Sequence, residues 1–215
     1  MPVMLFTDFG ADLYVGQVKA VLLEHAPAVP VIDLMHDAPA FDVAASAHLL
    51  AACVPRFPLG SVFLAVVDPG VGTSRGAIVM ECDGRYLVGP DNGLLSVCSA
   101  RARASRCWSI VWRPERMTSS FHGRDLFAPV AAAIAAGRWP EARLASIAGP
   151  AVALGTEDAY AVIYMDRYGN ACTGVRAELV PRNAWVRAAG RRLAYAPVFG
   201  AAQVGQPFWY ENSLG

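Results

Sequence analysis

Short apolar runs alternate with longer stretches of helical character along the first part of the chain. The run at residues 62–67 is apolar, rich in β-branched residues and too short for most helices, which is typical of a strand buried on both faces, and the short runs at 3–6 and 31–34 also predict strands. Residues 12–24 carry apolar positions at helical spacing, and residues 42–53 predict a second helix. Because strand and helix alternate, the pattern predicts an α/β fold with a parallel sheet.

The pattern changes after the third apolar run. Residues 77–81 and 85–88 predict two strands, and Asp83-Gly84 between them favours a tight hairpin turn. Residues 107–112 alternate enough to predict a further strand. The alanine-rich stretch 126–136 predicts a helix that ends before Gly137.

Glycine and proline become frequent over residues 147–158, where we place a domain boundary. Residues 1–150 form the predicted N-terminal α/β domain, and residues 158–215 form a smaller, antiparallel C-terminal β domain. No strong helix is expected beyond the boundary. The strands expected there are 159–165, 172–179, 184–188 and 192–195.

Composition and charge narrow the class of partner. The chain has 215 residues, of which 55% are hydrophobic, so it can bury a substantial core. Its 18 basic and 18 acidic residues cancel, and no basic excess indicates nucleic acid or a membrane surface, so a small-molecule ligand is expected. The five cysteines are scattered, and no signal peptide or membrane span is visible. We therefore expect a cytoplasmic protein with buried, reduced thiols.

Acidic residues follow several predicted strands. Asp8 and Asp68 end two buried runs, and Asp166 ends the first strand of the C-terminal domain. Open α/β sheets bind ligands at the carboxyl ends of their strands, where one carboxylate can accept both hydroxyls of a ribose. Asp68, followed by a turn and Arg75, is equally well explained as a turn residue. For Asp12 a helix cap is the preferred interpretation.

Other polar residues add weaker candidates. His122 lies in a glycine-containing loop, where a structural histidine is the usual case. Tyr168 and Asn170 are of the types that contact a purine, although their segment is also an ordinary turn. A metal set of Asp8, Asp68 and His122 is supported by no H-x-x-x-H or H-x-H spacing. No dinucleotide or triphosphate motif is present either, so we expect no metal and no cofactor.

Six motifs, in order along nearly the whole chain, resemble one family. They are T-D-F-G, V-D-P-G-V-G-T-x-R, G-P-D-N-G-L-L, F-H-G-R-D-x-F-A-P, D-x-Y-G-N and N-S-x-G. The family is that of the S-adenosylmethionine (SAM) hydrolases, also called SAM hydroxide adenosyltransferases, which are relatives of the SAM-dependent fluorinase and chlorinase. The resemblance implies that water or hydroxide attacks the ribose C5′ of SAM, giving adenosine and L-methionine, with SAM as the substrate.

The resemblance also implies an architecture. Each subunit would have a Rossmann-like N-terminal domain and a β-barrel-like C-terminal domain. Three subunits would form a homotrimer, with SAM between the N-terminal domain of one subunit and the C-terminal domain of the next. Family members usually continue past N-S-x-G, so residues 158–215 are expected to be short of the family's usual end.

Residue roles follow from the matched motifs. Asp68, Arg75 and His122 would handle the attacking water, and Asp8 would hold the ribose hydroxyls. The other expected contacts are Asp12 and Asp166 at the methionine ammonium, Tyr168 and Asn170 at the adenine, Ser213 near the methionine carboxylate, and Phe41 and Phe121 around the substrate.

The chemistry of these residues agrees with hydrolysis. The sulfonium of SAM leaves as a neutral thioether, so the enzyme needs alignment and a dry site rather than a general acid. Asp68 and His122 can accept a hydrogen bond from water, and Arg75 can stabilise a partly anionic oxygen.

Other functions remain as alternatives. The halogenases lack the acid and the histidine that this chain keeps, so hydrolysis is preferred over halide transfer. A SAM- or adenosine-binding module with little turnover comes next, and a metal-dependent hydrolase is a distant further alternative.

Overall fold

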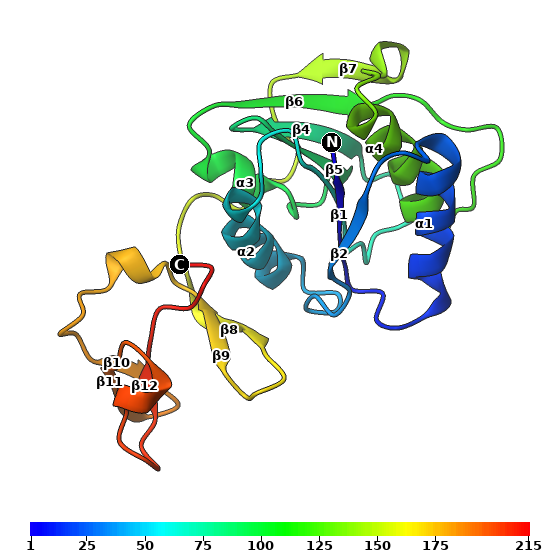
Figure 1. Ribbon diagram of the computed structural model, residues 1–215. Helices are drawn as coiled ribbons and strands as arrows, with labels where there is room; N and C mark the ends of the chain where they lie inside the picture. Colours follow the sequence, from blue (N-terminus) through cyan, green and yellow to red (C-terminus); the bar gives the residue numbers. More distant parts are fainter.

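A seven-stranded mixed sheet carries the N-terminal part of the chain in the computed structural model, which describes residues 1–215 (Figure 1). The strand order is β2-β1-β3-β5-β4-β6-β7. Neighbouring strands from β2 to β5 pair in parallel, and the pairs from β5 to β7 are antiparallel. The strands are β1 (Val3–Thr7), β2 (Val31–Met35), β3 (Val62–Val66), β4 (Ala77–Cys82), β5 (Arg85–Pro90), β6 (Ser105–Ile110) and β7 (Leu144–Ile147).

Helices cover both faces of this sheet, as Figure 1 shows. Because side chains alternate along a strand, Met4 and Phe6 of β1 join one core and Val3 and Leu5 join the other. Every residue of β1 and β3 is buried, which confirms for β3 the prediction of a strand enclosed on both faces. The first core lies under α2 (Val43–Cys53) and α3 (Ser96–Arg101), and the second lies under α1 (Leu13–His25) and α4 (Ala128–Ala135).

Most elements predicted for this part are confirmed, including the hairpin at Asp83-Gly84. The helix expected over 126–136 differs, because it begins earlier, as the π-helical turn η2 (Gly123–Phe127) that runs into α4. Strand β7 and helix α3 were not predicted. Helix α3 is short and directly follows a turn-rich segment, so it shows no helical period.

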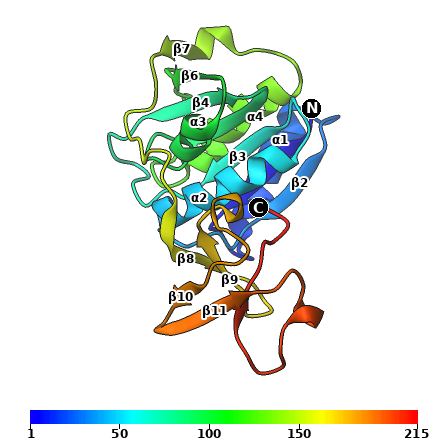
Figure 2. The same ribbon diagram turned by 90° about the vertical axis from the view of Figure 1, so that its left-hand side faces the viewer.

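The C-terminal part forms two small sheets (Figure 2). The strand expected over 172–179 is wrong beyond Gly174, where a 3-10 turn, η4 (Ala177–Leu179), follows. The expectation of a wholly antiparallel arrangement is also wrong, because β12 pairs in parallel with β11. Strand β8 packs on α2, and the Arg56 Nη2 donates to the Leu214 carbonyl at 2.6 Å. The strands are β8 (Ala159–Met165), β9 (Ala171–Gly174), β10 (Val186–Ala188), β11 (Arg191–Tyr195) and β12 (Phe208–Trp209).

The five cysteines are all free thiols, and four of them are buried. Burial raises the pKa of Cys53 and of Cys107 to about 11, and that of Cys82 to about 12. Cys98 is also buried, and its pKa is well above the ordinary value for the same reason. The prediction of buried thiols is confirmed for these four, whereas Cys172 is partly exposed. No helix combines the length and the apolar character that a membrane crossing requires.

Candidate active site

Three segments that are distant in sequence meet around a cleft at the carboxyl ends of β1 and β3. The loop after β1 supplies Asp8, the loop after β3 supplies Asp68, and the segment before η2 supplies His122. The cleft has a volume of about 270 Å³. Its lining comprises Asp8, Phe9, Asp12, Tyr14, Phe41, Val66, Asp68, Val71, Ser120, Phe121, His122 and Gly123.

Arg75 joins Asp68 to His122. Its Nε donates to Asp68 Oδ1 at 2.9 Å, and its Nη2 donates to Asp68 Oδ2. The same Nη2 donates to His122 Nδ1 at 2.9 Å. The side chains of Asp68 and Arg75 are only 4% and 10% exposed, so this two-pronged ion pair is shielded from water. The structure therefore brings together the three residues expected to handle the attacking water.

The contact with Arg75 sets the protonation of His122. A guanidinium can only donate, so Nδ1 must accept and the proton of the neutral imidazole lies on Nε2. Burial, and then the charge of Arg75, lower the pKa of His122 below its ordinary value of 6.5. The neutral ring of this cleft residue therefore carries its donor on Nε2, which differs from the acceptor role expected from the sequence.

Asp8 is half-buried at the end of β1. Its Oδ2 accepts a hydrogen bond from the backbone N–H of Phe41 at 3.2 Å. Burial raises the pKa of Asp8 above its ordinary value, and the negative charge of Asp68 adds to the increase. Phe41 has a φ of 59°, which is unusual for a residue with a side chain, and 75% of its surface is exposed. A large aromatic side chain is thus left open to solvent at the cleft.

Asp12 stands at the N-cap position of α1, yet its side chain makes no capping hydrogen bond. The preferred interpretation of Asp12 as a helix cap is therefore wrong. Asp12 is one of the residues that line the cleft. By contrast, Asp42 caps α2 by accepting from the Ala45 N–H at 2.9 Å.

None of the four expected residues of the C-terminal domain lines the cleft of its own chain. Asp166 forms a local turn, in which its Oδ1 accepts from the backbone N–H groups of Tyr168 and Asn170 at 2.9 Å each. Tyr168 is 81% exposed, and Ser213 is exposed in the last turn of the chain. The resemblance places these four residues at the site of a neighbouring subunit, so their roles at the substrate stay predictions.

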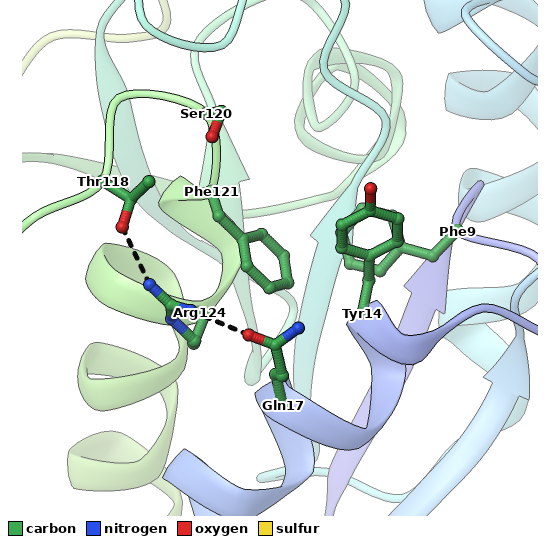
Figure 3. A pocket seen from close by; sticks show the side chains of 7 residues that line it. All are labelled: Phe9, Tyr14, Gln17, Thr118, Ser120, Phe121 and Arg124. Atoms are coloured by element: carbon green, nitrogen blue, oxygen red, sulfur yellow. Dashed lines mark hydrogen bonds between the residues drawn. The ribbon is translucent and has the colours of Figure 1, made fainter.

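Two aromatic residues of the cleft were missed. The rings of Phe9 and Tyr14 lie 5.7 Å and 5.4 Å from that of Phe121, measured between centroids. All three residues line both the cleft and a neighbouring cavity of about 350 Å³, whose lining is drawn in Figure 3. Phe9 could have been found, because it stands beside Asp8 in the loop after a buried strand, whereas nothing in the sequence distinguishes Tyr14.

Other proteins resemble this chain over nearly its full length. The family model of the SAM hydroxide adenosyltransferase N-terminal domain matches residues 3–143, and that of the C-terminal domain matches residues 160–215. The (R)-S-adenosyl-L-methionine hydrolase of Thermus thermophilus is 38% identical over 232 residues, covering 100% of this chain and 89% of that protein. The (R)-S-adenosyl-L-methionine hydrolase of Salinispora arenicola is 39% identical, covering 97% of this chain and 85% of that protein.

A more distant relative and a solved structure also resemble this chain. A fluorinase of Nocardia brasiliensis is 24% identical over 164 residues, which cover 63% of this chain and 55% of the fluorinase. The crystal structure of an uncharacterised conserved protein from Thermotoga maritima superimposes with a TM-score of 0.87 at 31% identity, covering 99% of this chain and 89% of that one. The hydrolase relatives are therefore the more similar in sequence, and the fold is shared along the whole chain.

Proposed function

Because this chain belongs to the SAM hydroxide adenosyltransferase family, we propose that it hydrolyses SAM to adenosine and L-methionine. The observation that carries the proposal is the group formed by Asp68, Arg75 and His122 beside the carboxylate of Asp8. A polar group fixed by its own hydrogen bonds can orient one water molecule for attack at a carbon held nearby.

The reaction is a displacement at C5′. A water oxygen forms a bond to C5′ while the bond from C5′ to sulfur breaks, and the sulfur keeps the electron pair as a neutral thioether. One proton of the attacking water passes to solvent. Since the leaving group is neutral, no acid has to protonate it, and catalysis depends on alignment and on exclusion of other water.

Each member of the group has a separate role in this proposal. His122 donates from Nε2 to one lone pair of the attacking oxygen, and the second lone pair of that oxygen attacks C5′. Arg75 fixes the ring through Nδ1, and Asp68 fixes the guanidinium. Mutual support of this kind keeps the donor in place without reorganisation during the reaction.

The remaining acids of the cleft suit a cationic substrate. Asp8, in its ionised form, accepts the two ribose hydroxyls, and Asp12 faces the methionine ammonium. Phe41 and Phe121 pack against the substrate. The positive sulfonium is itself favoured by carboxylates nearby.

A neighbouring subunit completes the site in this proposal. Asp166, Tyr168, Asn170 and Ser213 would reach the substrate from the C-terminal domain of the next chain in a homotrimer. The large exposed fractions of Phe41, which lines the cleft, and of Tyr168, which does not, support such an arrangement, because both rings would be covered on assembly. The Rossmann-like and barrel-like descriptions of the two domains, and a cytoplasmic location, stay predictions.

Incubation of the purified protein with SAM, with and without chloride, tests the function. We expect adenosine and L-methionine in equal amounts by chromatography, in either buffer. Chlorinated adenosine would indicate a halide-using transferase, and tight binding of SAM without product would indicate a binding module. We also propose that no cofactor or metal ion takes part, so activity should be unchanged in the presence of a chelator.

A further inference from the structure

The arginine and aspartate of the F-H-G-R-D motif make contacts that the proposed function does not use. Arg124 Nε donates to Asp125 Oδ1 at 2.6 Å. Its Nη1 donates to Gln17 Oε1 at 2.8 Å, and its Nη2 donates to Thr118 Oγ1 at 2.9 Å, both drawn in Figure 3. One guanidinium thus contacts helix α1, the loop before His122 and the π-helical turn after it.

These contacts connect the two walls of the cleft. Gln17 belongs to the same helix as Tyr14, and Thr118 belongs to the segment that leads into Phe121. The Arg124 guanidinium carbon also lies 5.2 Å from the centroid of the Phe121 ring, whose centroid is 5.4 Å from that of Tyr14. One side chain, which lines the neighbouring cavity and not the cleft itself, therefore contacts both of these walls.

We propose that Arg124 is a positioning residue, which holds the Phe121 segment against α1 and so places His122 in reach of Arg75. This inference rests on the proposed function. A lysine keeps the positive charge but lacks the planar fork that contacts three partners at once. The Thr118 backbone N–H also donates to Asp125 Oδ2 at 2.7 Å, without using Arg124. The loop therefore keeps one anchor when Arg124 is changed.

The role predicts a specific pattern in the kinetics. A small displacement of an aligned donor costs rate without removing substrate contacts, and a shift of about 1 Å can cost about 100-fold. We expect Arg124→Lys to lower kcat by about 10- to 100-fold while the Kd for SAM stays within about threefold. Gln17→Leu, which removes the acceptor on α1, should lower kcat in the same direction, and Gln17→Glu, which keeps an acceptor oxygen, should retain it.

The experiment measures kcat, Kd for SAM and the midpoint of thermal unfolding for these variants and for the double variant Arg124→Lys/Gln17→Leu. Because both single changes break the same bond, the double variant should lose less than the product of the two separate losses. Arg106→Lys is the matched control, since Arg106 pairs with Glu81 on the surface, and it should behave as wild type.

Three outcomes would overturn the inference. They are a wild-type kcat in Arg124→Lys, an equal loss in Gln17→Leu and Gln17→Glu, or a loss that appears only in Kd. If Arg124→Lys does not fold, the comparison of Gln17→Leu with Gln17→Glu decides alone. Failure of the proposed function looks different, because wild type itself would then release no adenosine.

Discussion

Arg75 Nη2 lies 2.9 Å from His122 Nδ1, although 47 positions separate the two residues in the sequence. The bond joins the loop after β3 to the segment before η2, and it assigns the imidazole proton to Nε2. The charge state of one residue is thus set by another from a different part of the sheet, which makes the pair the most direct target for experiments.

Replacement of His122 by alanine should remove the Nε2 donor and leave the substrate contacts in place. We expect kcat to fall by about 100-fold or more, with little change in the Kd for SAM. Single-turnover kinetics and calorimetric binding measure the two quantities. His25→Ala, at the exposed end of α1, is the control and should leave both unchanged. An equal loss of binding and rate would reject the proposed role of His122.

Acid should affect rate and binding through different groups. The pKa of His122 lies below the ordinary value of 6.5, so its ring is still neutral when the pH falls to 6.5. We therefore expect kcat to be constant around pH 6.5 and to fall only at lower pH. Asp8 has a pKa above its ordinary value of 3.8, and it must be ionised to accept hydrogen bonds from the ribose hydroxyls. KM should therefore begin to rise at a pH above 3.8 as the solution is made more acidic. Separate pH profiles of kcat and KM check both. A decline of kcat centred on pH 6.5 would contradict the first expectation.

Removal of the Asp68 carboxylate should destabilise the fold as well as reduce turnover. Asp68→Ala leaves the Arg75 side chain, 10% exposed, without its counter-ion, and we expect the free energy of unfolding to fall by about 3–5 kcal/mol. Urea denaturation measures this loss. In the control, Glu81→Ala frees Arg106, whose side chain is 68% exposed, and the cost should stay below about 1 kcal/mol. Similar losses in both variants would show that shielding of the Asp68 pair has no importance.

Two glycines of the loop after β3 should respond differently to alanine. A Cβ on Gly72 would lie 2.6 Å from the Ser119 carbonyl oxygen, and Gly72 has a φ of 80°. Gly72→Ala should therefore cost more than about 1–2 kcal/mol and push the segment of His122 away from Arg75, lowering kcat. Gly70, whose Cβ would approach no atom closer than 3.6 Å, is the control in the same loop. Equal behaviour of the two variants in unfolding and kinetics would contradict this reasoning.

A site shared between subunits predicts complementation. His122→Ala alters the cleft, whereas Tyr168→Ala alters the C-terminal domain, where the 81% exposed ring makes little contribution to folding. When the two variants are co-expressed, about a quarter of the sites should combine two intact halves, because each site of a cyclic trimer draws on two chains. Activity at low SAM should then exceed the sum of the separate variants, and simple averaging would count against shared sites.

Sequence reasoning recovers the layers of this fold well and its irregular parts poorly. The buried strands at β1 and β3 and the turn at Asp83-Gly84 have local signals, and these predictions are confirmed. Helix α3 has too few residues to show a period, and β12 is only Phe208–Trp209, so its pairing with β11 is decided by tertiary packing. No local sequence signal predicts the π-helical turn η2 that precedes α4.

The same division applies to the candidate site. Acids at strand ends could be found, because the carboxyl edge of a parallel sheet follows from topology. The helix-cap prediction failed for Asp12. An aspartate before a helix indicates a cap, but the sequence does not show whether its side chain makes the capping hydrogen bond. The proton position on His122 could not be found either, because it depends on a contact with Arg75 that only the folded chain creates.

The buried thiols have a practical consequence. Cys82, Cys98 and Cys107 all lie in the core beneath α2 and α3, where burial suppresses the thiolate that alkylating reagents attack. Any label they acquire under native conditions must therefore have entered while that face was transiently open. The rate at which these three thiols are alkylated therefore reports how often this layer opens, and mass spectrometry can measure it without an engineered probe.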